Sequence, residues 1–190
     1  MPAWAITAKQ TAVQKQKQID ESLISRIAGG DRQAFLKLYE QCSSSVYAYA
    51  LSMLRNVSDA EDVMQDTFLK IHGAAHLYKA KGKPMAWILT ITRNLCLMKL
   101  RKTSDLMAVS FEEAVAAPLR ETVHQSEDRI VLTAALSMLS PEESQIILLH
   151  AVSGLKHREI AELMQLPLST VLSKYNRGTK KLRKELEGKL

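Results

Sequence analysis

Acidic side chains crowd one short segment of a chain that is basic overall. Residues 58–72, SDAEDVMQDTFLKIH, hold the carboxylates of Asp59, Glu61, Asp62 and Asp66 against one lysine, while the whole chain carries a formal net charge of +6. Neighbouring carboxylates can act as general acids and bases in an enclosed pocket, or they can dock a basic partner from an open surface. The helical periodicity of the segment places them on an outer face, which favours docking.

Other reactive side chains do not form a catalytic or metal-binding pattern. His72 and His76 have a spacing that metal ligands use. No carboxylate or thiol lies at a helical position that would make it a third ligand beside them. Cys42 and Cys96 stand alone without CxxC spacing, so we expect them to be reduced and partly buried. No serine lies in a GxSxG context. The sequence therefore predicts no enzyme activity, no cofactor and no metal.

Composition restricts the class of protein further. A chain of 190 residues that is 46% hydrophobic and 24% charged is globular and long enough for one domain or two small ones. No apolar run approaches the roughly 18 residues of a membrane span, and the start lacks a signal-peptide core, so we expect a cytoplasmic protein. The excess of Lys and Arg favours a polyanionic partner, either nucleic acid or anionic lipid.

Helical periodicity begins after a polar amino-terminal segment. Residues 1–18 lack an apolar face and are expected to form a loose tail, with folding beginning near Ile19. A break at Gly29 and Gly30 then separates two helical patterns. Asp31 follows the break and can cap the second helix.

Two further helices are expected in the first half of the chain. One should start at Ser58, with Glu61 completing a capping box. Its inward stripe should comprise Ala60, Val63, Met64, Thr67, Phe68 and Ile71. The other should begin at Pro84, a residue that suits a first helical turn, and run to about Lys102.

The pattern changes after residue 102. Between residues 103 and 127 the periodicity fades and the formal charge is minus four, which is typical of a linker. Short helices are then expected around 130–138, from 141 to about 153, from 157 to 164, and from 169 to near the end. No β-type alternation is found, so the sequence predicts an all-α fold: two small helical domains, 19–102 and 128–190, joined by a flexible acidic linker.

The clearest motif lies near the carboxyl end. Residues 157–186, HREIAELMQLPLSTVLSKYNRGTKKLRKEL, have the order of a helix-turn-helix, with the second helix capped by Ser169. That helix carries six cations and no acid between Leu168 and Lys184, as a helix entering the DNA major groove requires. A membrane-surface helix would carry Trp, Phe and Leu on its apolar face, so DNA is the favoured polyanion.

A second basic segment lies far from the first. Residues 79–102 contain seven cations and no acid, and they also contain Trp87 and Asn94. Cations can bind phosphates and the Asn94 amide can read a base edge, so this segment also suits nucleic acid. Trp87 itself can simply anchor the core.

These segments together carry a resemblance to a known family. The acidic DAEDVMQDTFLKIH, then PMAWILTITRNLCLMKLRK, an acidic linker and the terminal helix-turn-helix follow one another as in bacterial RNA polymerase sigma factors of the extracytoplasmic function (ECF) group. The resemblance spans about residues 20–186. It implies that the acidic helix docks on the β′ clamp helices of core RNA polymerase, the matching positions being Asp62, Gln65 and Asp66, with Leu69 exposed beside them.

The resemblance also implies two promoter contacts. Residues 78–94 would bind the minus-ten element as it melts, with a flipped base held by the YKAKGKPM loop and Asn94, and with cations from Lys79, Lys81, Lys83 and Arg93. The last helix would read the minus-thirty-five element. Base contacts are expected from Ser173, Asn176 and Arg177 and phosphate contacts from Ser169, Thr170, Lys174, Lys180 and Lys181.

Two positions depart from the family pattern. Leu172 stands where Arg or Lys is common, and it could meet a thymine methyl group. Gln165 stands where a turn glycine is common. The departure at Leu172 leaves the base preference at that position open.

Partners and alternatives follow from the same resemblance. It implies core RNA polymerase, contacted at the β′ clamp helices and β flap, together with promoter DNA and an anti-sigma factor. The alternative is a free-standing helix-turn-helix regulator, which needs neither the acidic helix nor the remote basic segment. A nuclease is disfavoured because the chain has no carboxylate cluster suited to a metal.

Overall fold

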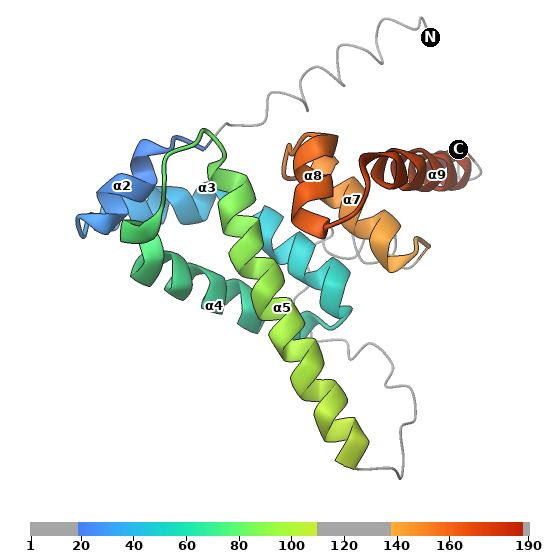
Figure 1. Cartoon of the computed structure of the whole chain (residues 1–190), viewed down its shortest axis with the longest axis horizontal. Helices are drawn as coiled ribbons and strands as arrows, with labels where there is room; N and C mark the ends of the chain where they lie inside the picture. Colours follow the sequence, from blue (N-terminus) through green and yellow to red (C-terminus); the bar gives the residue numbers. More distant parts are fainter. Residues whose placement is uncertain (1–18, 110–137, 188–190) are drawn as a thin grey trace, which may run out of the picture.

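The computed structural model describes residues 19–109 and 138–187, with side chains for 19–102 and 138–184. Every regular element in these ranges is a helix, which confirms the all-α prediction (Figure 1). The amino-terminal unit contains α2 (Ser22–Ala28), α3 (Arg32–Leu54), α4 (Val57–Ala74), the 3-10 turn η1 (Ala75–Leu77) and α5 (Pro84–Val109). The carboxyl-terminal unit contains α7 (Pro141–Ala151), α8 (His157–Met164) and α9 (Leu168–Glu187).

The turn between α2 and α3 forms as expected. Gly30 has a φ of 85°, a conformation that glycine adopts at little cost. Asp31 caps α3 by accepting hydrogen bonds from the amides of Gln33 and Ala34 at 2.9 and 3.1 Å. Its carboxylate also pairs with Arg26 at 2.6 Å, so one residue fixes both sides of the turn.

The start of α4 differs from the prediction. Helix α4 begins at Val57, and Asn56 is its cap, accepting a hydrogen bond from the Asp59 amide at 3.0 Å. Ser58 therefore lies inside the helix, and the expected capping box with Glu61 does not form. Asn and Ser cap helices about equally well, so the adjacent Asn56 was an equally good candidate. The inward stripe is confirmed, with Ala60, Val63, Thr67, Phe68 and Ile71 buried and Met64 partly buried.

Helix α5 also departs from the prediction at its carboxyl end. It begins at Pro84 as expected but continues to Val109, seven residues past the expected end at Lys102. The first part of the predicted linker is therefore helical. The rest of that linker, the expected tail at 1–18 and most of the helix expected at 130–138 lie outside the described residues.

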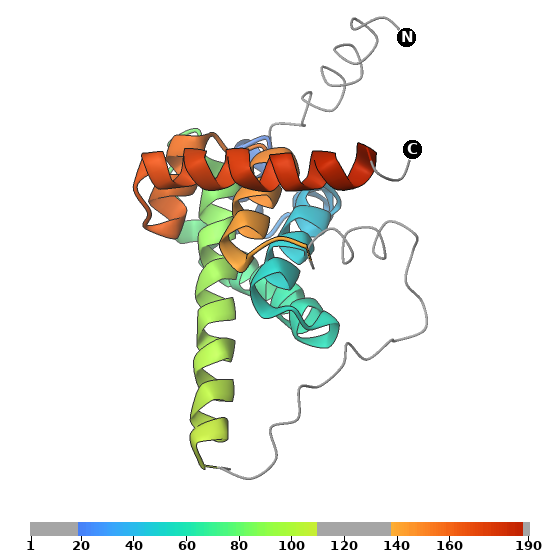
Figure 2. The same cartoon turned by 90° about the vertical axis from the view of Figure 1, so that its right-hand side faces the viewer.

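Helix α3 is the centre of the fold. It contacts α2, α4 and α5 in its own unit and α7 in the other (Figures 1 and 2). Tyr49 and Leu38 of α3 are fully buried, as are Ile71 of α4 and Ile88 of α5. Burying the apolar side chains of Leu38, Ile71 and Ile88 contributes about 1.5–3 kcal/mol each. Figure 2 shows that the carboxyl half of α5 extends away from this body.

The two units are packed against each other. Leu148 of α7, 5% exposed, inserts into an apolar cluster with Tyr47 and Leu51 of α3 and Cys96 of α5. The hydroxyl of Ser45 donates to the carbonyl of Val152 at 3.2 Å, and Arg55 donates to the carbonyl of Leu139 at 3.0 Å. The predicted domains therefore form one contiguous structure.

The two cysteines are free thiols in the core. Cys42 and Cys96 are both fully buried. Burial raises the pKa of each thiol to about 12. They are therefore poor nucleophiles in the folded protein, because the reactive form is the thiolate.

Candidate functional site

The acidic face of α4 is open to solvent. Asp62, Gln65, Asp66 and Leu69 are all exposed, and the exposed fraction of Leu69 is 70%. They share this face because Val63, Thr67 and Ile71 take the buried positions between them. An exposed leucine next to carboxylates is a surface suited to a basic, amphipathic partner helix.

Lys99 of α5 ties this acidic face to the body of the protein. Its ammonium lies 2.8 Å from Asp59 Oδ1 and 2.8 Å from Asp62 Oδ2. Partial burial lowers the pKa of Lys99, but hydrogen bonds to the two carboxylates outweigh that effect and hold the pKa above its ordinary value. Asp62 thus has an internal partner, while its side chain remains 60% exposed.

A groove of about 450 Å³ lies beside the basic loop that precedes α5. Its loop side is formed by Tyr78, Lys79, Lys81 and Lys83, and its α5 side by Ala86, Trp87 and Thr90. The rings of Tyr78 and Trp87 contact each other with centroids 4.9 Å apart. Aromatic rings flanked by cations are suited to stacking a nucleobase and pairing with its phosphate.

Asn94 and Arg93 lie outside this groove. Asn94 is exposed on α5, four residues after Thr90, so it shares the face of α5 that continues from the groove lining. Arg93 is only partly exposed. Three of the expected minus-ten cations, Lys79, Lys81 and Lys83, are therefore brought together, while Arg93 and Asn94 are placed about one turn further along.

The far wall of the groove comes from α8. Glu159 and Glu162 line it, and Lys83 Nζ lies 3.9 Å from Glu159 Oε1 and 3.6 Å from Glu162 Oε2. These ion pairs join the two units across a surface that the sequence assigned to DNA. The positions of the two glutamates in the sequence did not predict this contact with Lys83.

The helix-turn-helix is formed by α8 and α9. Ile160 and Val171 are fully buried, with Leu163 and Leu166 packed beside them. Gln165 ends α8 with a φ of 58°, the left-handed conformation that explains why glycine would be common at this position. Helix α9 begins at Leu168, so Ser169 lies in its first turn and is not its cap.

The outer face of α9 presents most of the predicted DNA-contacting residues. Leu172 is 41% exposed, and the side chain of Arg177 is 61% exposed. Ser169, Ser173, Asn176, Lys180 and Lys181 are also exposed, and Thr170 and Lys174 are partly exposed. The opposite face packs on α7 at Gly178, where an added Cβ would lie 2.6 Å from Ile147 Cδ1.

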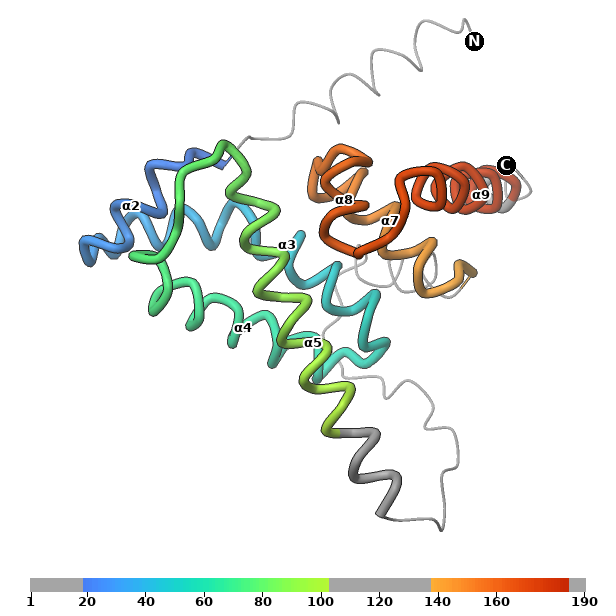
Figure 3. Tube along the Cα trace, viewed as in Figure 1, coloured from blue at the N-terminus to red at the C-terminus, as the bar shows by residue number. Residues whose placement is uncertain are grey.

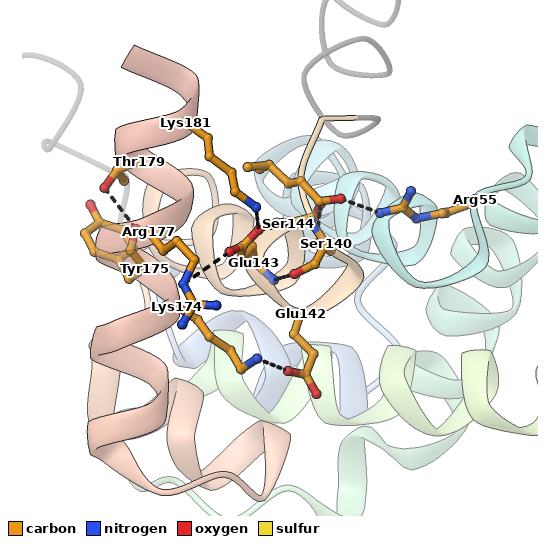
Figure 4. Close-up of polar contacts among 11 residues, drawn as sticks. Arg55, Ser140, Glu142, Glu143, Ser144, Lys174, Tyr175, Arg177, Thr179 and Lys181 are labelled. Carbon is orange, nitrogen blue, oxygen red and sulfur yellow. Dashed lines mark hydrogen bonds and ion pairs between the residues drawn. The ribbon is translucent and has the colours of Figure 1, made fainter. Parts of the chain in front are cut away.

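Two of these cations already have partners on α7 (Figure 4). Lys181 Nζ lies 2.7 Å from Glu143 Oε2, and Lys174 Nζ lies 2.6 Å from Glu142 Oε2. Glu143 is only 2% exposed and also completes a capping box with Ser140. The order Ser140-Pro-Glu-Glu143 is a capping-box signal that could have identified this residue from the sequence.

Glu143 remains charged despite its burial. Desolvation raises its pKa, but the hydrogen bond from Lys181 and the amide hydrogen bond from Ser140 outweigh it and hold the pKa below 4.5. The guanidinium of Arg177 lies 3.9 Å away and adds a weaker contact. The carboxylate thus holds α9 against α7.

Three aromatic rings also support α9. His150 stacks on His157 with centroids 4.3 Å apart, and Tyr175 packs edge-on against both. Burial and the neighbouring His150 lower the pKa of His157. These histidines are scattered in the sequence, but the fold brings them together, partly exposed, beside Tyr175 of α9.

Neither a metal centre nor a membrane span is found in the described parts of the chain. Within residues 19–102 and 138–184, no three His, Cys, Asp or Glu side chains gather closely enough to hold a metal ion. Of the helices described, none is both long and apolar enough to cross a bilayer.

Family models match both units. The model for sigma-70 region 2 matches residues 38–105, and the model for sigma-70 region 4 matches residues 129–182. The ECF RNA polymerase sigma factor SigK of Mycobacterium tuberculosis is 26% identical over 174 residues, covering 88% of this chain and 93% of SigK. The RNA polymerase sigma factor CarQ of Myxococcus xanthus is 29% identical over 169 residues, covering 88% of this chain and 97% of CarQ.

Solved structures share the fold. The sigma factor RpoE of Bartonella quintana, determined in complex with the anti-sigma factor NepR, matches with a TM-score of 0.65 and 24% identity, covering 80% of this chain and 96% of RpoE. CnrH, determined with the cytosolic domain of CnrY, matches with a TM-score of 0.61 and 22% identity, covering 90% and 98% of the two chains. This chain belongs to the sigma-70 family of RNA polymerase sigma factors, in its extracytoplasmic function group.

Proposed function

We propose that this chain is an alternative sigma factor that acts in the cytoplasm, binds core RNA polymerase through the acidic face of α4, and brings the enzyme to promoters through two DNA contacts. The observation that carries the proposal is the separation of three surfaces. The α4 face is acidic and apolar, while the loop before α5 and the outer face of α9 are basic. One protein would thereby contact the polymerase and two promoter elements at once.

Docking would use Asp62, Gln65, Asp66 and Leu69. The β′ clamp helices are the expected partner, with the β flap contacting the carboxyl-terminal unit. Carboxylates one turn apart would pair with a basic helix, and Leu69 would supply apolar contact at the centre.

Minus-ten recognition would use the groove beside the basic loop. Lys79, Lys81 and Lys83 would bind phosphates, and a flipped base would enter beside Tyr78 and Trp87, with Asn94 and Arg93 contacting the strand one turn away. Unstacking a base costs a few kcal/mol, which binding in the groove would offset. No ATP is then needed for melting.

Minus-thirty-five recognition would use α9 in the major groove. Ser173, Asn176 and Arg177 would reach base edges, with Leu172 against a thymine methyl group. Ser169, Thr170, Lys174 and Lys180 would contact phosphates. Lys181 would do so only by leaving its ion pair with Glu143.

Full access of DNA to the groove would require α8 to move away from the loop before α5, whereas the outer face of α9 is already exposed. Lys83 is paired with α8 in the packed form, and α8 forms one wall of the groove. Polymerase binding would select the separated form. An anti-sigma factor that stabilised the packed form would hold the protein inactive, which supports the proposal of such a partner.

The proposal is tested by comparing DNA binding with and without core polymerase. We expect tight, selective promoter binding only by the reconstituted holoenzyme. A free-standing regulator would bind its site unaided, but this alternative is not favoured because family matches cover both units and include region 2.

A further inference from the structure

Glu21 lies beneath the loop that borders the groove. It immediately precedes α2, far in sequence from the loop that joins η1 to α5, yet Figure 3 shows these two segments side by side. Its Oε1 accepts hydrogen bonds from the amides of Lys81 and Gly82 at 2.9 and 3.0 Å. The same oxygen accepts a hydrogen bond from the hydroxyl of Tyr78.

These three donors fix the shape of the loop. Gly82 has a φ of 68°, so the chain turns sharply there and directs two successive amides toward one point. Backbone amides converging in this way form a nest for an anionic oxygen. The partly exposed Glu21 fills that nest, while Lys79, Lys81 and Lys83 of the same loop line the groove.

Glu21 also fixes the aromatic wall of the groove. The Tyr78 ring contacts Trp87, and its hydroxyl is held by Glu21, so the ring cannot rotate away without losing a charged hydrogen bond. The hydrogen bond from Tyr78 lowers the pKa of Glu21, and the carboxylate stays ionised at neutral pH. One side chain thus sets both the backbone and the ring that face the groove.

We propose that Glu21 is a positioning residue for promoter melting: it holds the Tyr78–Gly82 loop in the shape that receives the unstacked nucleotide. This inference rests on the proposed function of the groove. Glu21 does not line the groove and would not touch DNA. It acts by ordering the loop in advance, so that the conformational entropy of the loop is not lost at the moment of base capture.

A simpler role for Glu21 would be to stabilise the start of α2. The neighbouring Asp20 offers a matched control, because it accepts a hydrogen bond from the Ser22 amide at 3.0 Å and makes no contact with the loop among those described. If the effect came from α2 alone, Asp20→Ala would reproduce it.

The test uses full-length variants reconstituted with core polymerase, on a promoter selected by the wild-type holoenzyme from a random library. Three quantities are measured separately: the affinity for core polymerase, promoter binding before melting, and the rate of promoter opening. Promoter opening is followed by 2-aminopurine fluorescence. For Glu21→Ala we expect opening to slow about tenfold, the typical effect of losing a charged hydrogen-bond acceptor, with core binding unchanged. Glu21→Gln should open at a rate between those of Glu21→Ala and the wild type, because its neutral amide oxygen still accepts hydrogen bonds from the loop but binds them more weakly than a carboxylate.

Two results would overturn the inference. One is opening by Glu21→Ala at the wild-type rate. The other is an equal loss in Asp20→Ala and Glu21→Ala with no recovery in Glu21→Gln. If Glu21→Ala does not fold, Tyr78→Phe removes one donor while keeping the ring on Trp87, and wild-type opening by that variant would also count against the inference. Failure of the wild-type holoenzyme to open any library promoter would instead refute the proposed function.

Discussion

Lys83 of the basic loop before α5 and Glu159 of α8 face each other across the two units, with Nζ and Oε1 3.9 Å apart. Glu162 lies 3.6 Å from the same ammonium. A lysine expected to bind promoter DNA is therefore paired with carboxylates of the unit expected to bind the other promoter element. If Lys83 binds promoter DNA as proposed, its ammonium must leave the two carboxylates of α8.

Separation of the units should follow when their apolar contact is broken. Leu148→Asp places a charge in the cluster formed with Tyr47, Leu51 and Cys96, so we expect the units to part and the radius of gyration to increase in small-angle X-ray scattering. Leu172→Asp is the control, since Leu172 is exposed on α9 and should leave the radius unchanged. An unchanged radius for Leu148→Asp, with helicity intact, would show that this contact does not hold the units together.

Charge reversal on α4 should weaken polymerase binding. Asp62→Lys/Asp66→Lys should raise the Kd for core polymerase at least about tenfold, because desolvated charge pairs at an interface contribute strongly to affinity. Both residues are exposed, and the charge reversal gives up only a surface ion pair between Asp62 and Lys99, which contributes at most about 1 kcal/mol, so circular dichroism should show the same helix content as the wild type. Glu40→Lys, an exposed reversal on α3, is the matched control. Full affinity in the double variant would remove α4 from the docking surface.

Neighbouring lysines on α9 should behave differently. Lys181→Ala should lower the free energy of unfolding by about 1–3 kcal/mol, since it takes a hydrogen-bond partner from the buried Glu143 carboxylate. Lys180→Ala should leave unfolding by urea unchanged but reduce the salt dependence of promoter binding. Equal stability of the two variants would mean that the Lys181–Glu143 pair does not hold α9 to α7.

A fall in pH should weaken the packing of α9 on α7, because Glu143 of α7 loses its charge. Its pKa in the folded protein lies below the ordinary value of 4.5, so its ionised form contributes stability above about pH 4.5, and this contribution is lost as the pH falls through the lower, folded-state pKa. Urea unfolding of Glu143→Gln should therefore show a weaker loss of stability between about pH 5 and 3 than the wild type. Parallel pH profiles would contradict this assignment.

We expect Arg177 to contribute to the recognition of promoter sequence as well as to the affinity for DNA. Its side chain is 61% exposed, and its contact with Glu143 is long at 3.9 Å, so it is free to reach the major groove. Arg177→Ala should cost about 1–3 kcal/mol at one base pair and relax preference there, measured by holoenzyme binding to a set of promoter variants. Equal weakening on every variant would assign Arg177 to a phosphate.

Local signals in the sequence predicted the helices well. Three predictions were correct: the cap of α3 at Asp31, the start of α5 at Pro84, and the limits of α8 at His157 and Met164. Caps, proline and periodicity act over a few residues and can therefore be recognised in the sequence. The cap of α4 was wrong by two positions, since Asn56 and Ser58 are both good caps. The continuation of α5 to Val109 was missed because its last turns lack a clear apolar face.

Contacts between distant residues could not be predicted. Three contacts join residues that lie tens of positions apart in the sequence: Glu143 with Lys181, Glu21 with the Lys81 amide, and Leu148 with the α3 cluster. No spacing rule encodes such pairs. The candidate site residues were predicted from the family resemblance, and helical phase predicted only that the acidic face of α4 would be exposed. The internal partners of these residues were not predicted.

The central claim is that this chain directs core RNA polymerase to promoters through three separate surfaces. The most direct test is in vitro transcription with purified core polymerase on a random promoter library, read by sequencing the transcripts. We expect transcripts only when the chain is added, starting downstream of shared minus-ten and minus-thirty-five elements, and lost with Asp62→Lys/Asp66→Lys. Transcripts that do not depend on the chain, or tight selective DNA binding by the chain without the polymerase, would contradict the account.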